Sequence, residues 1–119
     1  MNFCLLLVNS MAIEKKFKIL IYPGLHSRPG GEFVKFVSEF EGNVEIKKGE
    51  KSGDGRSIMA LFKLLPKQFE EITIKLTGEC EEQFMDKITL WEASAFLNEE
   101  DYLNENVDES TLKVFKEVD

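Results

Sequence analysis

The stretch "FKILIYPGLHSRPGGEFVKFVSEF", residues 17–40, combines a strand pattern, a turn and a helix pattern. Apolar residues alternate over its first six positions, which predicts a strand with one buried face. Pro23 and Gly24 then form a turn signal that ends the strand. Further on, the apolar residues recur at positions i, i+3, i+4 and i+7, the stripe of an amphipathic helix, namely Phe33, Phe36, Val37 and Phe40. We therefore expect a strand, a tight turn and a helix in succession.

The next part of the chain continues this alternation of strands and helices. The expected elements are a strand over 43–47, at most a short or irregular strand within 48–55, a short helix from Ser57 to Pro66, a strand over 71–78 and a long helix over 80–95. The order β-α-β-(β)-α-β-α contains a hairpin-like connection between its second and third strands. This predicts an α+β fold, an antiparallel or mixed sheet of about four strands with helices on one face.

The acidity of the chain is concentrated near its C-terminus. Residues 92–119 hold nine acidic and two basic side chains, a balance of −7 that equals the net charge of the whole chain. We expect residues 98–109 to be flexible and "STLKVFKEV", residues 110–118, to form a weak terminal helix. The expected organisation is an N-terminal extension over 1–13 with Met11 as the true start, a domain over 14–98 and an acidic tail over 99–119.

Composition and charge exclude several classes of protein. Hydrophobic residues make up 43% and charged residues 31% of the chain, enough for a buried core in one domain. A net charge of −7 argues against nucleic acid or an anionic membrane as a partner. The apolar run "FCLLLV" is too short to span a membrane or to act as a secretory signal. Two cysteines, Cys4 and Cys80, form neither a disulfide framework nor a zinc set, so we expect a cytoplasmic protein in a reducing compartment.

The single histidine, His26, lies at the expected start of the first helix. A helix N-terminus carries about +0.5 charge and unpaired N–H donors, so it favours an anion. Arg28 adds a planar donor fork suited to phosphate, and the next residues, Gly30 and Gly31, keep side chains away. The positive helix N-terminus and the positive charge of Arg28 both favour a neutral, nucleophilic imidazole on His26. A structural or incidental surface histidine is the alternative; no second histidine or cysteine pair supports a metal site, and no partnered Ser–His–Asp set supports a general base.

Two motifs resemble one family of bacterial carriers. "GLHSRP" resembles the active centre of HPr, the histidine-containing phosphocarrier of the phosphoenolpyruvate-dependent sugar phosphotransferase system. "RSIMALF", residues 56–62, is similar to the family's regulatory-serine motif, and Ser57 follows His26 by 31 residues, as in the family. The resemblance covers about residues 14–98 and implies an open-faced β-sandwich with three helices on one face, in the order βαββαβα.

The resemblance also implies roles for individual residues. His26 would accept a phosphoryl group from phospho-enzyme I and pass it to enzyme IIA domains, and Arg28 would stabilise that group. The chain would then be a carrier without cofactor or metal and not a turnover catalyst by itself. Ser57 is expected to cap its helix, and by resemblance it is a target of HPr kinase/phosphorylase.

The family's docking patch corresponds to several residues here, for which core packing or ordinary solvated surface is the alternative. They are Leu25, Ile58, Met59 and Phe62, with Lys35 and Arg56 at the rim. Gly30, Gly31 and "SGDG" depart from the family pattern and put the first helical turn and the third strand in doubt. The open alternatives are a monomeric carrier in sugar uptake, a carrier in a nitrogen-type regulatory chain, and a regulator that acts only through Ser57.

Overall fold

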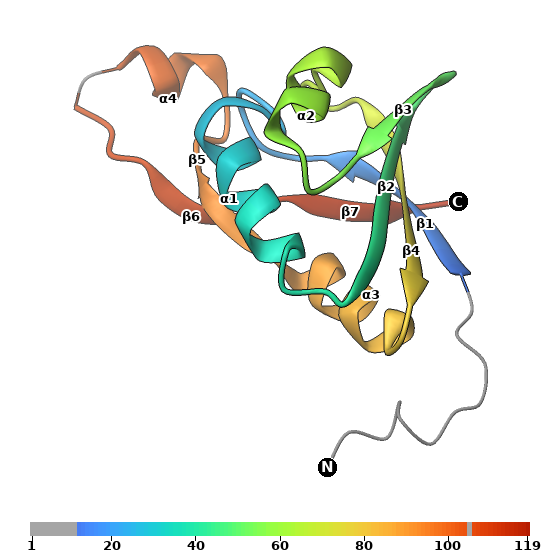
Figure 1. Cartoon of the computed structure of the whole chain (residues 1–119). Coiled ribbons are helices and arrows are strands. Elements are labelled where there is room, and N and C mark those ends of the chain that lie inside the picture. Colours follow the sequence, from blue (N-terminus) through green and yellow to red (C-terminus); the bar gives the residue numbers. More distant parts are fainter. Residues whose placement is uncertain (1–11, 105) are drawn as a thin grey trace.

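The computed structural model describes residues 12–104 and 106–119 and contains one main antiparallel sheet (Figure 1). Its strand order is β3-β2-β4-β1-β7, with β1 at Ala12–Ile19, β2 at Gly42–Lys48, β3 at Lys51–Asp54, β4 at Glu71–Gly78 and β7 at Phe115–Val118. The helices are α1 (Ser27–Val37), α2 (Ile58–Leu64), α3 (Glu81–Leu90) and α4 (Glu99–Leu103). A separate two-stranded antiparallel sheet pairs β5 (Glu92–Ala95) with β6 (Ser110–Lys113).

The main sheet has one covered and one open face. Along β4, Ile72, Ile74 and Leu76 are buried, whereas the alternate residues face the other way and are more exposed. The covered face packs against residues of α1, α2 and α3, including Phe33, Leu61 and Ile88. The open face carries charged side chains, such as Lys47 paired with Glu14. The predicted open-faced α+β sandwich is therefore confirmed, with five strands in the sheet instead of about four.

The predicted boundaries hold best where the apolar pattern is long. The strand predicted over 71–78 has those bounds, and the short strand expected within 48–55 is β3, with four residues. The glycines of "SGDG" have a packing reason, because a Cβ on Gly53 would lie 3.0 Å from the Cβ of Ala60 in α2. A Cβ on Gly55 would clash with Val44 and Ile46 of β2 in the same way. Small residues here let α2 lie close to the sheet.

The long helix predicted over 80–95 was wrong beyond residue 90. The chain turns extended at Trp91, with φ −65° and ψ 141°, and Ala93 and Ala95 are then buried at strand spacing in β5. Trp91 stacks on Phe36 of α1, with ring centroids 5.4 Å apart and an interplanar angle of 3°. Trp91 and Ala95 are spaced for a helical stripe as well as for a strand, and the packing of Trp91 on Phe36 favours the strand.

The C-terminal segment also differs from the prediction of a flexible acidic tail with a weak helix. Residues 99–103 form α4, and residues 110–118 form β6 and β7 instead of a helix. Val114 and Phe115 are fully buried, and β7 pairs with the edge of β1 in the main sheet. Figure 1 shows α4 and the β5–β6 pair at the side of the molecule opposite the tip of β3. Residues 110–118 are thus part of the domain, whereas α4 buries none of its residues.

Cys80, which precedes α3, is disulfide-bonded, a bond that the sequence did not indicate. The predicted N-terminal extension and the start at Met11 lie almost entirely outside the described residues. No helix in the described part of the chain is long and apolar enough to cross a membrane.

Candidate functional site

The loop before α1 is fixed to the segment that follows α2. The Leu25 N–H donates to the Pro66 carbonyl at 2.8 Å, and Gly24 forms an antiparallel bridge with Lys67. Gly24 has a φ of 133° and lies so close to Pro66 and Lys67 that a Cβ would collide with their backbone. This pairing brings Lys67, which is remote in sequence, to the neighbourhood of His26.

His26 is the N-cap residue of α1, but its side chain makes no cap hydrogen bond. Its Nε2 lies 3.2 Å from the Pro23 carbonyl oxygen, and its Nδ1 lies 3.3 Å from the Ser27 Oγ. A carbonyl can only accept a hydrogen bond, so Nε2 carries the proton in the neutral ring. Nδ1 therefore keeps its lone pair, and the Ser27 hydroxyl can donate to it. The geometry leaves Nδ1 as the nucleophilic nitrogen.

The pKa of His26 is lowered from its usual 6.5, chiefly by partial burial. The hydrogen bond to Pro23 opposes this shift, whereas the positive charges of Lys67 and Lys48 lower the pKa further. The sequence predicts that the helix N-terminus and Arg28 keep the ring neutral, and a lowered pKa agrees with that direction. The causes differ, because burial is the largest and the positive charges are those of Lys67 and Lys48.

Lys48 is held in place by three acceptors. Its Nζ donates to the carbonyl oxygens of Leu64 and Leu65, at 3.1 and 2.9 Å, where α2 ends. It also lies 2.9 Å from a carboxylate oxygen of Glu70. Burial alone would raise the pKa of Glu70. Hydrogen bonds from the Lys48 side chain and the Lys67 backbone, together with the positive charges of both lysines, outweigh burial and lower this pKa overall. One side of the site is thus an ordered cluster of Lys48, Lys67 and Glu70.

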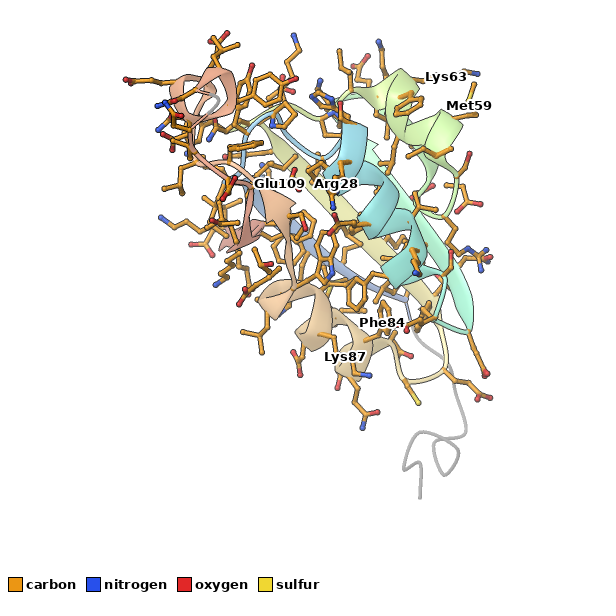
Figure 2. All side chains as sticks on the ribbon, turned by 90° about the vertical axis from the view of Figure 1, so that its left-hand side faces the viewer. Arg28, Met59, Lys63, Phe84, Lys87 and Glu109 are labelled. Atoms are coloured by element: carbon orange, nitrogen blue, oxygen red, sulfur yellow. The ribbon has the colours of Figure 1, made fainter. Side chains whose placement is uncertain are left out.

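The first turn of α1 offers an anion-binding end beside His26. No acidic side chain lies in that turn, and the Gly30 N–H donates to the His26 carbonyl at 3.1 Å. Arg28 follows His26 by two residues and its side chain is 70% exposed. Its guanidinium pairs with Glu32 in the next helical turn and with Glu109 in the C-terminal segment (Figure 2). Glu109 was not predicted, because no local pattern in the sequence links it to Arg28.

Ser57 is the N-cap residue of α2, as predicted from its position. Its Oγ accepts a hydrogen bond from the Ala60 N–H at 3.2 Å, and the residue is partly exposed. Arg56, immediately before it, donates its backbone N–H to Asp54 and pairs with the same carboxylate through its side chain at 3.6 Å. The Ser57 hydroxyl therefore lies at the start of α2, next to Arg56, whose charge is partly neutralised by Asp54.

The residues expected to dock partners separate into two groups. Met59 and Phe62 on α2 are 63% and 49% exposed, and Lys35 on α1 is exposed as well. Ile58 is half-buried against the core, and Leu25 is fully buried. Assigning Leu25 to a docking surface was wrong, because its side chain fills the core below α1.

The exposed apolar surface is larger than the motif indicates. Leu65 and Phe69, just beyond α2, are 41% and 63% exposed and were missed, because Pro66 interrupts the helical pattern there. Lys63 and Lys67 are exposed at the same end of the molecule. α2 also lies beside the start of α1, since a Cβ on Gly30 would be 3.9 Å from the Ile58 side chain. An apolar surface with basic side chains thus lies next to the histidine loop.

Comparisons with known proteins agree on one family. The family model described as "PTS HPr component phosphorylation site" matches residues 13–91. The HPr-like protein Crh of Bacillus subtilis is 28% identical over 79 residues, covering 66% of this chain and 93% of Crh. The phosphocarrier protein HPr of Haemophilus influenzae is 32% identical over 75 residues, which are 63% of this chain and 88% of that protein.

A solved structure shows the same fold. The phosphocarrier protein HPr from Bacillus anthracis aligns with a TM-score of 0.61 and 27% identity, covering 63% of this chain and 89% of that one. The family match ends at Trp91, so β5, α4, β6 and β7 lie beyond it. With a family model that spans most of the main sheet, α1, α2 and α3, the chain belongs to the HPr family of phosphotransferase-system phosphocarriers.

Proposed function

We propose that His26 accepts a phosphoryl group from phospho-enzyme I and passes it to enzyme IIA domains. The observation that carries this proposal is the ring geometry, in which Nε2 is hydrogen-bonded to Pro23 and Nδ1 keeps its lone pair. Partial burial and two lysines lower the pKa of the ring, so the nucleophilic form is available at neutral pH. We expect a cytoplasmic monomer, which can meet its donor and its acceptors in turn.

The transfer step balances without a cofactor or metal. The Nδ1 lone pair forms a bond to phosphorus while the bond between phosphorus and the donor nitrogen of enzyme I breaks, and that electron pair returns to the donor. The Nε2 proton remains bonded toward Pro23. The donors at the start of α1 and the Arg28 guanidinium favour the charge of the arriving group. The same step in reverse, toward an acceptor nucleophile on an enzyme IIA domain, releases the group, so the chain is a carrier and not a turnover catalyst.

The surface on α2 provides a docking site for both kinds of partner in this proposal. Met59 and Phe62 supply exposed apolar contact, and a methionine side chain adapts to different partner surfaces. Arg56 just before α2 and the exposed Lys63 within it add positive charge, and Lys35 is exposed on α1. Partners with an apolar patch surrounded by acidic groups would fit this surface.

A specific observation also favours regulation at Ser57 by HPr kinase/phosphorylase. Its hydroxyl is partly exposed at the start of α2, and no acidic side chain lies in the first turn of that helix. A phosphate there would be stabilised by the helix N-terminus, so it would not disrupt the fold. It would place negative charge two residues before Met59 and repel acidic partners. The kinase should modify the wild type and not Ser57→Ala, and Ser57→Asp should weaken the interaction with enzyme I.

The decisive experiment for the carrier function is phosphorylation by phosphoenolpyruvate and enzyme I. We expect an acid-labile phosphate on the wild type and none on a folded His26→Ala variant. No transfer to folded wild-type protein by an active enzyme I would contradict the carrier function and leave a regulator that acts only through Ser57. Transfer onward to a sugar-specific enzyme IIA domain indicates sugar uptake, whereas transfer only to a nitrogen-type acceptor indicates the regulatory chain.

A further inference from the structure

Arg28 is bound by two carboxylates on the side of the site that faces the C-terminal segment. Its Nη1 lies 2.8 Å from Glu109 Oε1, and its Nε lies 3.5 Å from Glu32 Oε2. The Glu109 side chain is only 24% exposed, so it is more enclosed than Arg28. Figure 2 shows the two labelled residues side by side at the start of α1. The shorter of the two contacts comes from a residue beyond the family match.

The position of Glu109 is fixed by the ordered structure that follows it. It directly precedes β6, in which Ser110 pairs with Ala95 of β5. Beyond β6, Phe115 is fully buried in the core. Since the chain is anchored immediately after Glu109, the contact with Arg28 belongs to the fold and is not an accident of a free tail.

Glu32 is attached to the same part of the structure. Its Oε1 accepts a hydrogen bond from the backbone N–H of Ser94 in β5, at 3.1 Å. Its other oxygen points to Arg28. Both carboxylates thus connect the C-terminal sheet to the guanidinium, and both occupy donors that a phosphate would use.

We propose that Glu109 competes with the phosphoryl group and with acidic partner surfaces for Arg28. A phosphate dianion that binds Arg28 must displace the Glu109 carboxylate or share the guanidinium with it. The C-terminal segment therefore lowers the affinity of the His26 site for phosphate and acts as a positioning element for Arg28. By linkage, binding of phosphate weakens the Arg28–Glu109 contact to the same extent. The consequence for transfer to and from His26 rests on the carrier function proposed above.

The first test is independent of enzyme I and uses inorganic phosphate as the probe. Phosphate is titrated into the full chain at low ionic strength while the Arg28 Nε–H and His26 ring signals are followed by NMR. Glu109→Gln removes the competing charge and keeps the side-chain size. It should tighten phosphate binding about two- to five-fold, the upper part of the range for surface ion pairs. The gain should shrink as added salt screens the pair.

A matched variant separates the contact from general electrostatics. Asp108→Asn removes the same charge one residue away, from an exposed side chain. It should leave phosphate affinity close to that of the wild type, and Glu109→Asp should retain part of the competition. Equal phosphate affinities for the wild type and a folded Glu109→Gln variant would overturn the proposal. So would an equal gain in Glu109→Gln and Asp108→Asn, since it would show only a change in net charge.

Kinetics with enzyme I then test the consequence for transfer. The KM for Glu109→Gln as phosphoryl acceptor should fall about two- to five-fold with little change in kcat, because the substitution removes competition and not a reacting group. A substitution that only altered packing would not lower KM at constant kcat and also tighten phosphate binding. Absence of any transfer to the wild type would contradict the carrier function, while the phosphate titration would still decide whether Glu109 competes for Arg28.

Discussion

Replacing Phe115 by alanine should show how firmly the C-terminal segment belongs to the domain. The Phe115 side chain is fully buried. Its ring centroid lies 5.2 Å from that of Phe17, 5.8 Å from Phe33 and 6.1 Å from Trp91. Loss of a buried phenylalanine costs about 3–5 kcal/mol, and each aromatic pair adds about 0.5–1.5 kcal/mol to the burial of area. We expect Phe115→Ala to lower the free energy of unfolding by a value near the upper end, about 4–5 kcal/mol.

Urea unfolding followed by tryptophan fluorescence measures this change, since Trp91 packs on Phe115. Natural domains have about 5–15 kcal/mol of stability, so the loss would be a large share of the total. Lys116→Ala, on an exposed side chain in the same strand, is the matched control and should stay within about 0.5 kcal/mol of the wild type. A loss below about 1 kcal/mol for Phe115→Ala would mean that β7 is detachable and that the reasoning from burial is wrong.

Three other measurements test local features of the site. Ser57→Ala should cost about 1 kcal/mol in thermal or urea unfolding, because the bond to the Ala60 N–H is lost; an unchanged stability would argue against the cap. Gly31→Ala should stabilise the protein by about 0.4–1 kcal/mol, since nothing lies near its added Cβ, whereas Gly30→Ala should gain less because its Cβ would lie 3.2 Å from the Leu25 carbonyl oxygen. NMR titration should place the pKa of His26 below 6.5, and Lys67→Gln should raise it. Between the lowered pKa and 6.5, the unfolded chain binds more protons at His26 than the folded chain does. His26 should therefore increase the free energy of unfolding as pH rises through that window and decrease it as pH falls. A measured His26 pKa at or above 6.5 would contradict the electrostatic account.

The sequence predicts the elements whose pattern is long and bounded by clear signals. In β4, apolar residues alternate up to Gly78, and the strand has the predicted bounds. Ser57 was identified as a helix cap from its place before an apolar run, and its side chain makes that bond. Both features depend on neighbours along the chain, so a local pattern contains the information that they need.

The C-terminal strands depend instead on partners that are remote in sequence. β6 and β7 have four residues each, too short for a reliable period, and Val114 and Phe115 are adjacent yet both buried. Phe115 lies in the core because β7 pairs with the free edge of β1, with Phe115 opposite Ile19. Acidic composition around this segment suggested a solvated tail, and the packing of one aromatic side chain outweighs that composition.

The same division applies to the candidate site. The motif around His26 identifies the histidine, the arginine and the helix N-terminus, because these residues are consecutive in the chain. Lys67 reaches the site through the bridge with Gly24, and Glu109 reaches it through the pairing of β6 with β5. Neither contact has a local signature, so the sequence could not show which charges surround the ring.

These remote contacts make the charge around the histidine asymmetric. Burial lowers the pKa of the His26 ring and the charges of Lys67 and Lys48 lower it further, whereas the guanidinium of Arg28 is already bound by Glu32 and Glu109. A carrier must bind a phosphoryl group well enough to accept it and weakly enough to release it to the next protein. Two lysines with no competing C-terminal carboxylate would favour retention, and carboxylates on Arg28 shift the balance toward release, because a dianion there meets like charge. The C-terminal extension contributes to the fold through Phe115. If His26 carries the phosphoryl group as proposed, the extension also contributes to the transfer equilibrium through Glu109. A truncation would then change both the fold and the equilibrium, whereas Glu109→Gln would change the equilibrium alone.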